Sequence, residues 1–208
     1  MRRLLGLFFD LLYHPLAWMY GLVAVVVSLG RWKSWVLSVR PYLRGRVLEI
    51  GFGPGHLQAA LNEAGLEPFG LDESRQMSRQ AGRRLRRQGL PVRLTRGYAQ
   101  NLPFVRDSFD SVAATFPSEY IFEEQALAEI RRVLRPGGRL VIVPSAWITG
   151  KGRLERLAAV LFRVTGQAEA LERVLPGMKR RIAGSGFAVK HELLEQAGSR
   201  VLVMIATK

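Results

Sequence analysis

Cysteine is absent from this chain of 208 residues. Its absence excludes a disulfide scaffold, a thiolate metal site and any mechanism that depends on a cysteine nucleophile, and we expect no metal. Acidic residues are scarce, because 17 Asp and Glu stand against 31 Lys and Arg and give a formal net charge of +14. A surplus of this size attracts anionic partners such as lipid head groups or nucleic acid.

A long uninterrupted hydrophobic run is also lacking. Residues 11–30 carry no charged side chain, but Tyr13, His14 and Pro15 interrupt the first third of this stretch. The strongly apolar part, 16–29, would form a helix of about 21 Å, against a hydrocarbon core of about 30 Å. No A-x-A-like cleavage site follows, so export is not expected. Three interpretations stay open: a segment lying in the membrane interface, a lid folded over the domain, and a membrane span.

From residue 46 onward, short β-branched runs alternate with helical patterns, which is typical of parallel βαβ units. The patterns predict strands at 46–50, 67–72, 91–97, 109–116 and 137–144, and helices at 54–65, 74–89 and 123–134. Two further strand patterns, at 186–194 and 200–208, predict an antiparallel hairpin. We therefore expect an α/β domain over 46–208, preceded by an apolar lid or membrane-docking segment over 1–45. A helical insertion over 146–184 is expected beside the binding site for a substrate.

The most informative string is the glycine-rich turn that follows the first predicted strand. Glycines at 51, 53 and 55 let the backbone turn sharply and approach a ligand, and the next helix points its free N–H groups into the same space. The spacing G-x-G-x-G differs from the dinucleotide fingerprint and from the P-loop. Asp72 ends the next strand, where a carboxylate can accept both hydroxyls of a ribose.

Four ordered segments resemble the motifs of the class I S-adenosylmethionine-dependent methyltransferases. They are VLEIGFGPGH, GLDES with Met77 behind it, GYAQNLPFVRDSFDSVAATF and EIRRVLRPGGRLVIV, and together they cover about residues 46–145. The resemblance implies a Rossmann-like, seven-stranded, mostly parallel sheet with a C-terminal antiparallel hairpin. It also implies that the protein is an enzyme with S-adenosylmethionine as its cofactor.

The resemblance also implies a set of cofactor-binding residues. The methionine part would lie along the first glycine-rich motif, Asp72 would hold the ribose, and the remaining positions would border the adenine or lie under the methionine. Many relatives have an Asp where this chain has Tyr98, so adenine recognition would rest on backbone groups and stacking. The expected residues are Glu49, Gly51, Phe52, Gly53, Gly55, Asp72, Glu73, Ser74, Met77, Tyr98, Ala99, Gln100, Thr115 and Phe116.

Methyl transfer needs a general base only when the acceptor must lose a proton early. The candidates are Glu119 and Tyr120, which follow the fourth strand, and His14 in the N-terminal segment. The opening YHPLAWMYGLVAVVVSLGRWKSW resembles, more weakly, that of the ubiquinone and menaquinone C-methyltransferases and related lipid methyltransferases. This favours a small lipophilic acceptor, either a quinone precursor or a phospholipid amine head group, and a peripheral contact with an anionic membrane at its cytoplasmic face.

Two alternatives stay open. Between Ser74 and Arg106 there is no acidic residue, and nine arginines there could follow the phosphate backbone of RNA or another nucleic acid. Against a nucleic-acid acceptor, the chain has no Pro-Pro-aromatic clamp after the fourth strand and no appended nucleic-acid module. The second alternative is a non-catalytic module that keeps the methyltransferase-like fold.

Overall fold

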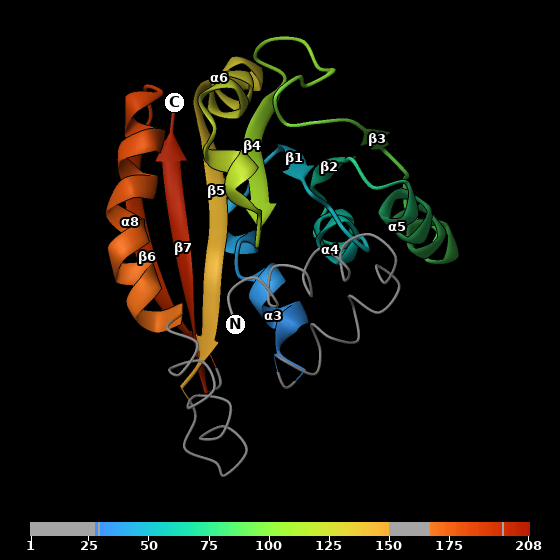
Figure 1. The fold of residues 1–208 in the computed structure, drawn as a ribbon. Helices are drawn as coiled ribbons and strands as arrows, with labels where there is room; N and C mark the ends of the chain where they lie inside the picture. The colour runs from blue at the N-terminus through green and yellow to red at the C-terminus, as the bar shows by residue number, and fades with distance from the viewer. Residues whose placement is uncertain (1–27, 29, 150–166, 197) are drawn as a thin grey trace.

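The computed structural model describes residues 28, 30–149, 167–196 and 198–208, and within them a single sheet of seven strands (Figure 1). The strand order is β3-β2-β1-β4-β5-β7-β6, with β1 to β5 parallel and β7 antiparallel to both of its neighbours. This confirms the expected Rossmann-like sheet with its C-terminal hairpin. The strands are β1 (Arg46–Ile50), β2 (Glu67–Asp72), β3 (Leu94–Arg96), β4 (Phe109–Thr115), β5 (Leu134–Ile148), β6 (Ala188–Gln196) and β7 (Ser199–Thr207).

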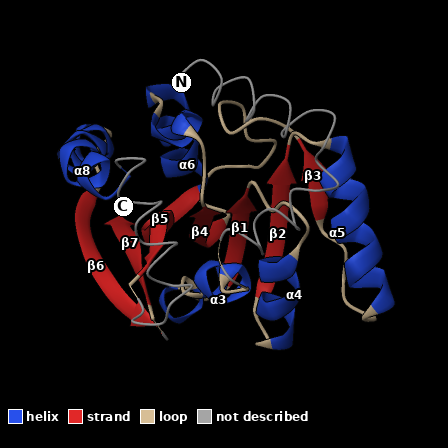
Figure 2. Cartoon of the chain, turned by 60° about the horizontal axis from the view of Figure 1, so that its bottom comes forward, coloured by secondary structure: helices blue, strands red, loops and turns tan. Residues whose placement is uncertain are grey.

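Helices cover both faces of the sheet, which is therefore the middle of three layers (Figure 2). On one face, apolar residues of α3 and α4 form a core with Val47 and Val141, whereas on the other face α6 and α8 pack over Leu48 and Ile142. Adjacent strand residues thus point to opposite cores, as the alternation of a strand requires. The helices are α3 (Trp32–Leu37), α4 (His56–Glu63), α5 (Arg75–Arg87), α6 (Glu124–Val133) and α8 (Gln167–Gly184), with 3-10 turns at η1 (Arg40–Tyr42) and η2 (Glu119–Phe122).

Two predicted strands differ from the structure by three or more residues at one end or both, whereas the other strands differ by two residues or fewer. Strand β5 begins at Leu134, which pairs with Phe109 of β4, and it continues to Ile148 because it keeps pairing with β7 on both sides of a register shift between Ile142 and Ser145. The first residues of the range expected as a helical insertion, 146–148, therefore belong to the sheet. Strand β3 is shorter than predicted, since only residues 94–96 pair with β2.

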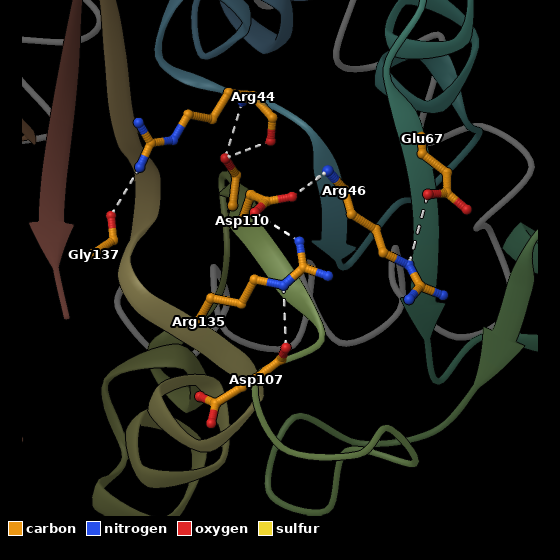
Figure 3. A network of polar contacts seen from close by, with 8 residues as sticks. Arg44, Arg46, Glu67, Asp107, Asp110, Arg135 and Gly137 are labelled. Carbon is orange, nitrogen blue, oxygen red and sulfur yellow. Dashed lines mark hydrogen bonds and ion pairs between the residues drawn. The ribbon is translucent and has the colours of Figure 1, made fainter.

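Polar contacts tie the amino ends of the central strands together (Figure 3). The carboxylate of Asp110 accepts hydrogen bonds from the backbone N–H of Arg46, at 2.8 Å, and from the Arg135 guanidinium, also at 2.8 Å. Arg44 donates from its guanidinium to the carbonyl of Gly137 at 3.0 Å. This network lies at the end of the sheet opposite to the glycine-rich turn, because that turn follows the carboxyl end of β1.

Helix α3 joins the chain before the domain to the sheet. The indole nitrogen of Trp35 donates a buried hydrogen bond of 2.9 Å to the hydroxyl of Ser199, the first residue of β7. Among the helices that the structure describes, none is long and apolar enough to cross a membrane. His14 and the charge-free stretch up to residue 27 lie outside the described residues, as do residues 150–166 of the expected insertion.

Candidate functional site at the carboxyl ends of the strands

The glycine-rich turn connects β1 to α4, and its three glycines have positive φ angles of +74°, +51° and +79° at 51, 53 and 55. A β-carbon on Gly55 would lie 2.8 Å from the β-carbon of Ala81 in α5, so only glycine allows this close approach. A β-carbon on Gly53 would meet no atom of the described residues within 4 Å. The part of the chain that the structure describes therefore leaves the backbone of Gly53 accessible to a ligand.

Side-chain contacts with β2 and α5 hold the glycine-rich turn in place. Phe52 is buried, and its ring lies 2.6 Å from the position of a β-carbon on Gly70, so this strand glycine makes room for it. Arg84 donates from Nε to the carbonyl of Pro54 at 2.9 Å. Phe52 thus contributes its backbone to the turn while its side chain anchors the turn to the sheet.

Asp72 ends β2 and fastens the glycine turn to the start of α5. One carboxylate oxygen accepts a hydrogen bond of 2.9 Å from the N–H of Gly53, and the other accepts one of 2.8 Å from the N–H of Ser74. The pKa of Asp72 is raised overall, because the effect of burial exceeds that of these two backbone hydrogen bonds, which lower it. Because a carboxylate oxygen has more than one lone pair, both oxygens keep acceptor capacity for two neighbouring hydroxyls.

Glu49 lies one residue before the end of β1 and is 1% exposed. Its carboxyl group accepts a hydrogen bond of 2.8 Å from Nε2 of Gln58, which also donates to the carbonyl of Phe69 at 3.1 Å. Burial raises the pKa of Glu49 to about 8, and the nearby Asp72 adds to the shift. Gln58, which the sequence did not single out, therefore fixes the orientation of an acid that retains its proton at neutral pH.

The residues expected around the adenine fall into two groups. Ser74 is the N-cap of α5, where its hydroxyl accepts from the N–H of Met77 at 3.2 Å, and Glu73 accepts a hydrogen bond at its carbonyl from Arg96. Across from them, in the turn after β3, Ala99 is buried and Tyr98 is 63% exposed.

Gln100 lies in the same turn and makes a side-chain hydrogen bond to the residue before α6. Its amide Nε2 donates to the Glu123 carboxylate at 2.7 Å, which connects the turn to the start of α6. The ring of Tyr98 is therefore exposed enough to stack on a ligand, whereas the amide of Gln100 already makes an exposed hydrogen bond to Glu123.

An aromatic pair stands at the end of β4. Phe116 has a φ of +50°, a conformation that bulky residues rarely adopt, and it directly follows Thr115, the last residue of the strand. Its ring stacks on that of Trp32 at 4.4 Å between centroids, and Trp35 lies 6.3 Å away. The sequence did not predict this contact of α3 with the end of β4.

The two described candidates for a general base occupy different positions in η2. Glu119 is exposed, whereas Tyr120 is partly buried and packs against the core. The hydroxyl oxygen of Tyr120 lies 3.0 Å from the position of a β-carbon on Gly51. Tyr120 therefore reaches the glycine turn, and the third candidate, His14, is outside the described residues.

A groove of about 810 Å³ lies between α6 and the end of α8. Its walls carry both signs of charge, with Glu124 and Glu129 among Arg131, Arg132 and Arg181. Arg132 is already paired with Glu129 at 2.6 Å. The groove is lined by none of the glycine-turn residues, so we place the chemistry at the carboxyl ends of β1, β2 and β4.

The geometry of the glycine-rich turn and Asp72 is compatible with the binding of S-adenosylmethionine. No described residue fills the space beside Gly53, so a ligand can approach this backbone closely, and Asp72 offers two acceptor oxygens. Helix α4 begins directly after the turn, and a helix N-terminus favours negatively charged groups. A seven-stranded sheet that ends in an antiparallel hairpin, and whose first turn meets the end of the second strand in this way, is the arrangement that the resemblance to class I methyltransferases implies.

Comparison with known proteins agrees with this class. Residues 48–142 match the family model described as "Methyltransferase domain". The demethylmenaquinone methyltransferase of Thermus thermophilus is 30% identical over 209 aligned residues, which cover 88% of this chain and 94% of that protein. Other relatives are matched over a smaller share, such as 56% of the demethylmenaquinone methyltransferase of Renibacterium salmoninarum, which is 34% identical.

Solved structures share the fold at low sequence identity. The YcgJ protein of Bacillus subtilis superposes with a TM-score of 0.61 over 84% of this chain and 97% of that one, at 19% identity. Phosphoethanolamine N-methyltransferase 2 of Haemonchus contortus, solved in complex with S-adenosyl-L-methionine, gives a TM-score of 0.58 over 86% of this chain and 53% of that one, at 17% identity. The chain belongs to the S-adenosylmethionine-dependent methyltransferases, in the group of the demethylmenaquinone and ubiquinone C-methyltransferases, and its cofactor is S-adenosylmethionine.

Proposed function

We propose that the protein transfers the methyl group of S-adenosylmethionine to a ring carbon of a lipophilic quinol, with a demethylated menaquinone as the best-supported acceptor. The relative that spans almost the whole chain is a demethylmenaquinone methyltransferase. The weaker resemblance of the N-terminal segment to the quinone C-methyltransferases agrees with it. The chemical class of the methyl acceptor needs further support from the geometry of the site.

The observation that carries the proposal is the stacked pair of Phe116 and Trp32 at the end of β4. A left-handed backbone at a bulky residue costs about 1–3 kcal/mol and persists where the surrounding structure over-determines it, which happens most often at functional sites. The strained backbone conformation of Phe116 places its ring against Trp32, next to Thr115. Two aromatic rings there offer a flat apolar wall against which a planar ring can stack.

The bound cofactor supplies an electrophilic methyl group on a sulfonium. The acceptor ring becomes a strong carbon nucleophile when a ring hydroxyl has lost its proton, and the carbon that gains the methyl group then releases its own hydrogen as a proton. Tyr120 is the described side chain whose hydroxyl reaches the glycine turn, so we assign it the role of receiving or orienting a proton at that hydroxyl. The apolar rings of Phe116 and Trp32 would exclude water from the space that they border.

A direct assay tests the acceptor class. The full chain is incubated with methyl-tritiated S-adenosylmethionine and three acceptors in parallel: a short-tailed demethylmenaquinone kept in its reduced quinol form, phosphatidylethanolamine in vesicles, and a mixed RNA pool. We expect label in the quinol product alone. Label in the phospholipid or in RNA, with none in the quinol, would overturn the proposal, provided that calorimetry shows cofactor binding by the same preparation.

A further inference from the structure

Helix α5 carries a stripe of arginines on one exposed face. Positions 75, 79, 83, 86 and 87 fall within an arc of about 120°, since successive residues of an α-helix are about 100° apart. All of them are exposed, while Ala81 and Leu85 on the other side of the helix are buried. We call this set the α5 stripe: Arg75, Arg79, Arg83, Arg86 and Arg87.

The stripe has no counter-charge of its own. No side chain of the five makes an ion pair or hydrogen bond with any residue that the structure describes, and no Asp or Glu occurs between positions 74 and 106. Arg84 in the same helix is different, because it is partly buried and holds the carbonyl of Pro54. Of the six arginines of α5, Arg84 thus stabilises the glycine turn, and the other five face solvent.

We propose that the α5 stripe docks the enzyme on an anionic phospholipid bilayer. Clustered basic residues gain attraction from a negatively charged leaflet, each by an amount that salt reduces. The helix spans 13 residues, or about 20 Å, so one straight face presents all five guanidinium groups to a plane at once. Guanidinium groups also donate hydrogen bonds to phosphate oxygens in a bidentate geometry.

The stripe suits a lipid surface better than a nucleic acid. The remaining exposed residues of the α5 helix are Gln76 and Gln80, so no aromatic ring on this face can stack with a base. Single-stranded nucleic acid is normally held by aromatic stacking as well as charge, whereas lipid phosphates require charge alone. The stripe begins at Arg75, directly after the N-cap Ser74, so one end of the docked helix lies beside the carboxyl end of β2.

Vesicle sedimentation tests the proposal with the full chain. The probes are vesicles of phosphatidylcholine alone and vesicles that contain about one third phosphatidylglycerol. The test variant is Arg79→Gln/Arg83→Gln/Arg86→Gln, and the control is Arg40→Gln/Arg180→Gln/Arg181→Gln, whose arginines are exposed on other elements. Each triple variant lowers the formal net charge from +14 to +11, so a difference between them reflects position and not total charge.

We expect binding to the anionic vesicles only, weakened roughly hundredfold in the α5 variant and little in the control, because each arginine at the surface contributes about fivefold. High salt should abolish the binding. Equal loss in both variants, unchanged binding in the α5 variant, or α5-dependent binding to RNA without binding to vesicles would overturn the proposal. The charge-free stretch 11–30 is present in both variants and cannot account for a difference between them.

Docking by the α5 stripe does not depend on which acceptor the enzyme methylates. Sedimentation needs neither cofactor nor acceptor, so a failure of quinol methylation leaves its result intact. Calorimetric binding of S-adenosylmethionine to the α5 variant is expected to match that of the parent protein, because none of the three arginines contacts the glycine turn. That measurement also establishes that the variant is folded.

Discussion

The hydroxyl oxygen of Tyr120 lies 3.0 Å from where a β-carbon on Gly51 would stand. Two parts of the site therefore meet, since Gly51 opens the glycine turn after β1 and Tyr120 belongs to the 3-10 turn after β4. Gly51 also has a φ of +74°, which only glycine adopts at no cost. A side chain at position 51 is thus excluded for two separate reasons, one local and one across the site.

The Gly51→Ala substitution separates these reasons. We expect it to lower the free energy of unfolding by about 1–2 kcal/mol for the left-handed backbone, with a further loss from the contact with Tyr120. Gly65→Ala, at a φ of +73° and with no atom of the described residues within 4 Å of the new β-carbon, is the matched control for backbone strain alone. Denaturant unfolding measures both.

Adding Tyr120→Phe should restore the excess loss of Gly51→Ala over Gly65→Ala. If the double variant is simply the sum of its parts, the contact between Tyr120 and Gly51 carries no energy. Cofactor affinity, measured by calorimetry, should fall with Gly51→Ala and stay constant with Gly65→Ala, because position 65 lies outside the site.

Tyr120→Phe on its own is expected to lower kcat about a hundredfold or more, because it removes a hydroxyl that handles a proton, and to change cofactor affinity little. Glu119→Gln serves as the neighbour control, since Glu119 is exposed and should leave kcat nearly unchanged. Steady-state kinetics with the accepted substrate give both values. A larger effect at Glu119 than at Tyr120 would transfer the proton-handling role to Glu119.

The sequence predicted most of the sheet because its strands are short β-branched runs bounded by turn residues. The bounds of β1 and β2 agree with the predicted ranges. Strand β5 is longer than predicted because Pro136 and Gly137 suggested a turn, whereas the chain stays extended from Leu134 and pairs beyond residue 144. The start at Leu134 depends on pairing with Phe109 of β4, and the extension beyond residue 144 depends on β7, which is distant in the sequence.

The site was predictable only where a residue acts through local geometry. Glycine spacing and the position of Asp72 indicate the cofactor turn without knowledge of the fold. Three features need long-range contacts: the stacking of Trp32 on Phe116, the hydrogen bond from Gln58 to Glu49, and the approach of Tyr120 to Gly51. Their residue types are ordinary in sequence, so no local signal distinguishes them from packing residues.

The buried acid Glu49 makes stability depend on pH. Its pKa is about 8 in the folded protein and 4.5 in a model peptide, so between these values the folded state keeps a proton that the unfolded state has lost. The stability of the fold therefore falls as pH rises from about 4.5 to 8, by at most about 1.4 kcal/mol per pH unit. Glu49→Gln should remove this fall and keep the hydrogen-bonding partnership with Gln58.

His56 sets the pH range in which the effect of Glu49 is seen alone. Burial, followed by the charges of Arg84 and Lys33, lowers the pKa of His56 to about 4 from 6.5. Stability from this group rises with pH between 4 and 6.5 and opposes the effect of Glu49 there. Denaturant unfolding between pH 6.5 and 8 is the decisive measurement, and equal slopes for the parent and Glu49→Gln would contradict the buried protonated acid.

Asp110 provides a test at the opposite end of the sheet. Its carboxylate joins Arg46 to Arg135, and these hydrogen bonds hold the pKa of Asp110 below its usual value. Asp110→Ala should cost about 1–3 kcal/mol of stability at neutral pH and less in acid, where the parent carboxylate becomes protonated. Cofactor affinity should not change, since the glycine turn is at the other end of the strands, and a clear loss of affinity would show that the two ends are coupled.

Phe116 allows backbone strain and ring stacking to be measured separately. Phe116→Ala removes the stack on Trp32 and keeps a β-carbon in the left-handed conformation, whereas Phe116→Gly removes the stack and relieves the strain. We expect the glycine variant to be more stable than the alanine variant by about 1 kcal/mol, the reverse of their usual order within a strand or helix.

Activity should follow the ring and not the strain. If the stacked pair forms a wall of the acceptor site, the alanine and glycine variants lose quinol methylation to a similar extent, while Phe116→Tyr keeps most of it because a ring remains to stack. The effect should appear mainly in KM for the acceptor, and cofactor affinity should change little. Full activity of the alanine variant would show that the strained residue serves only to pack α3 against the sheet, and the case for a planar acceptor would lose its structural support.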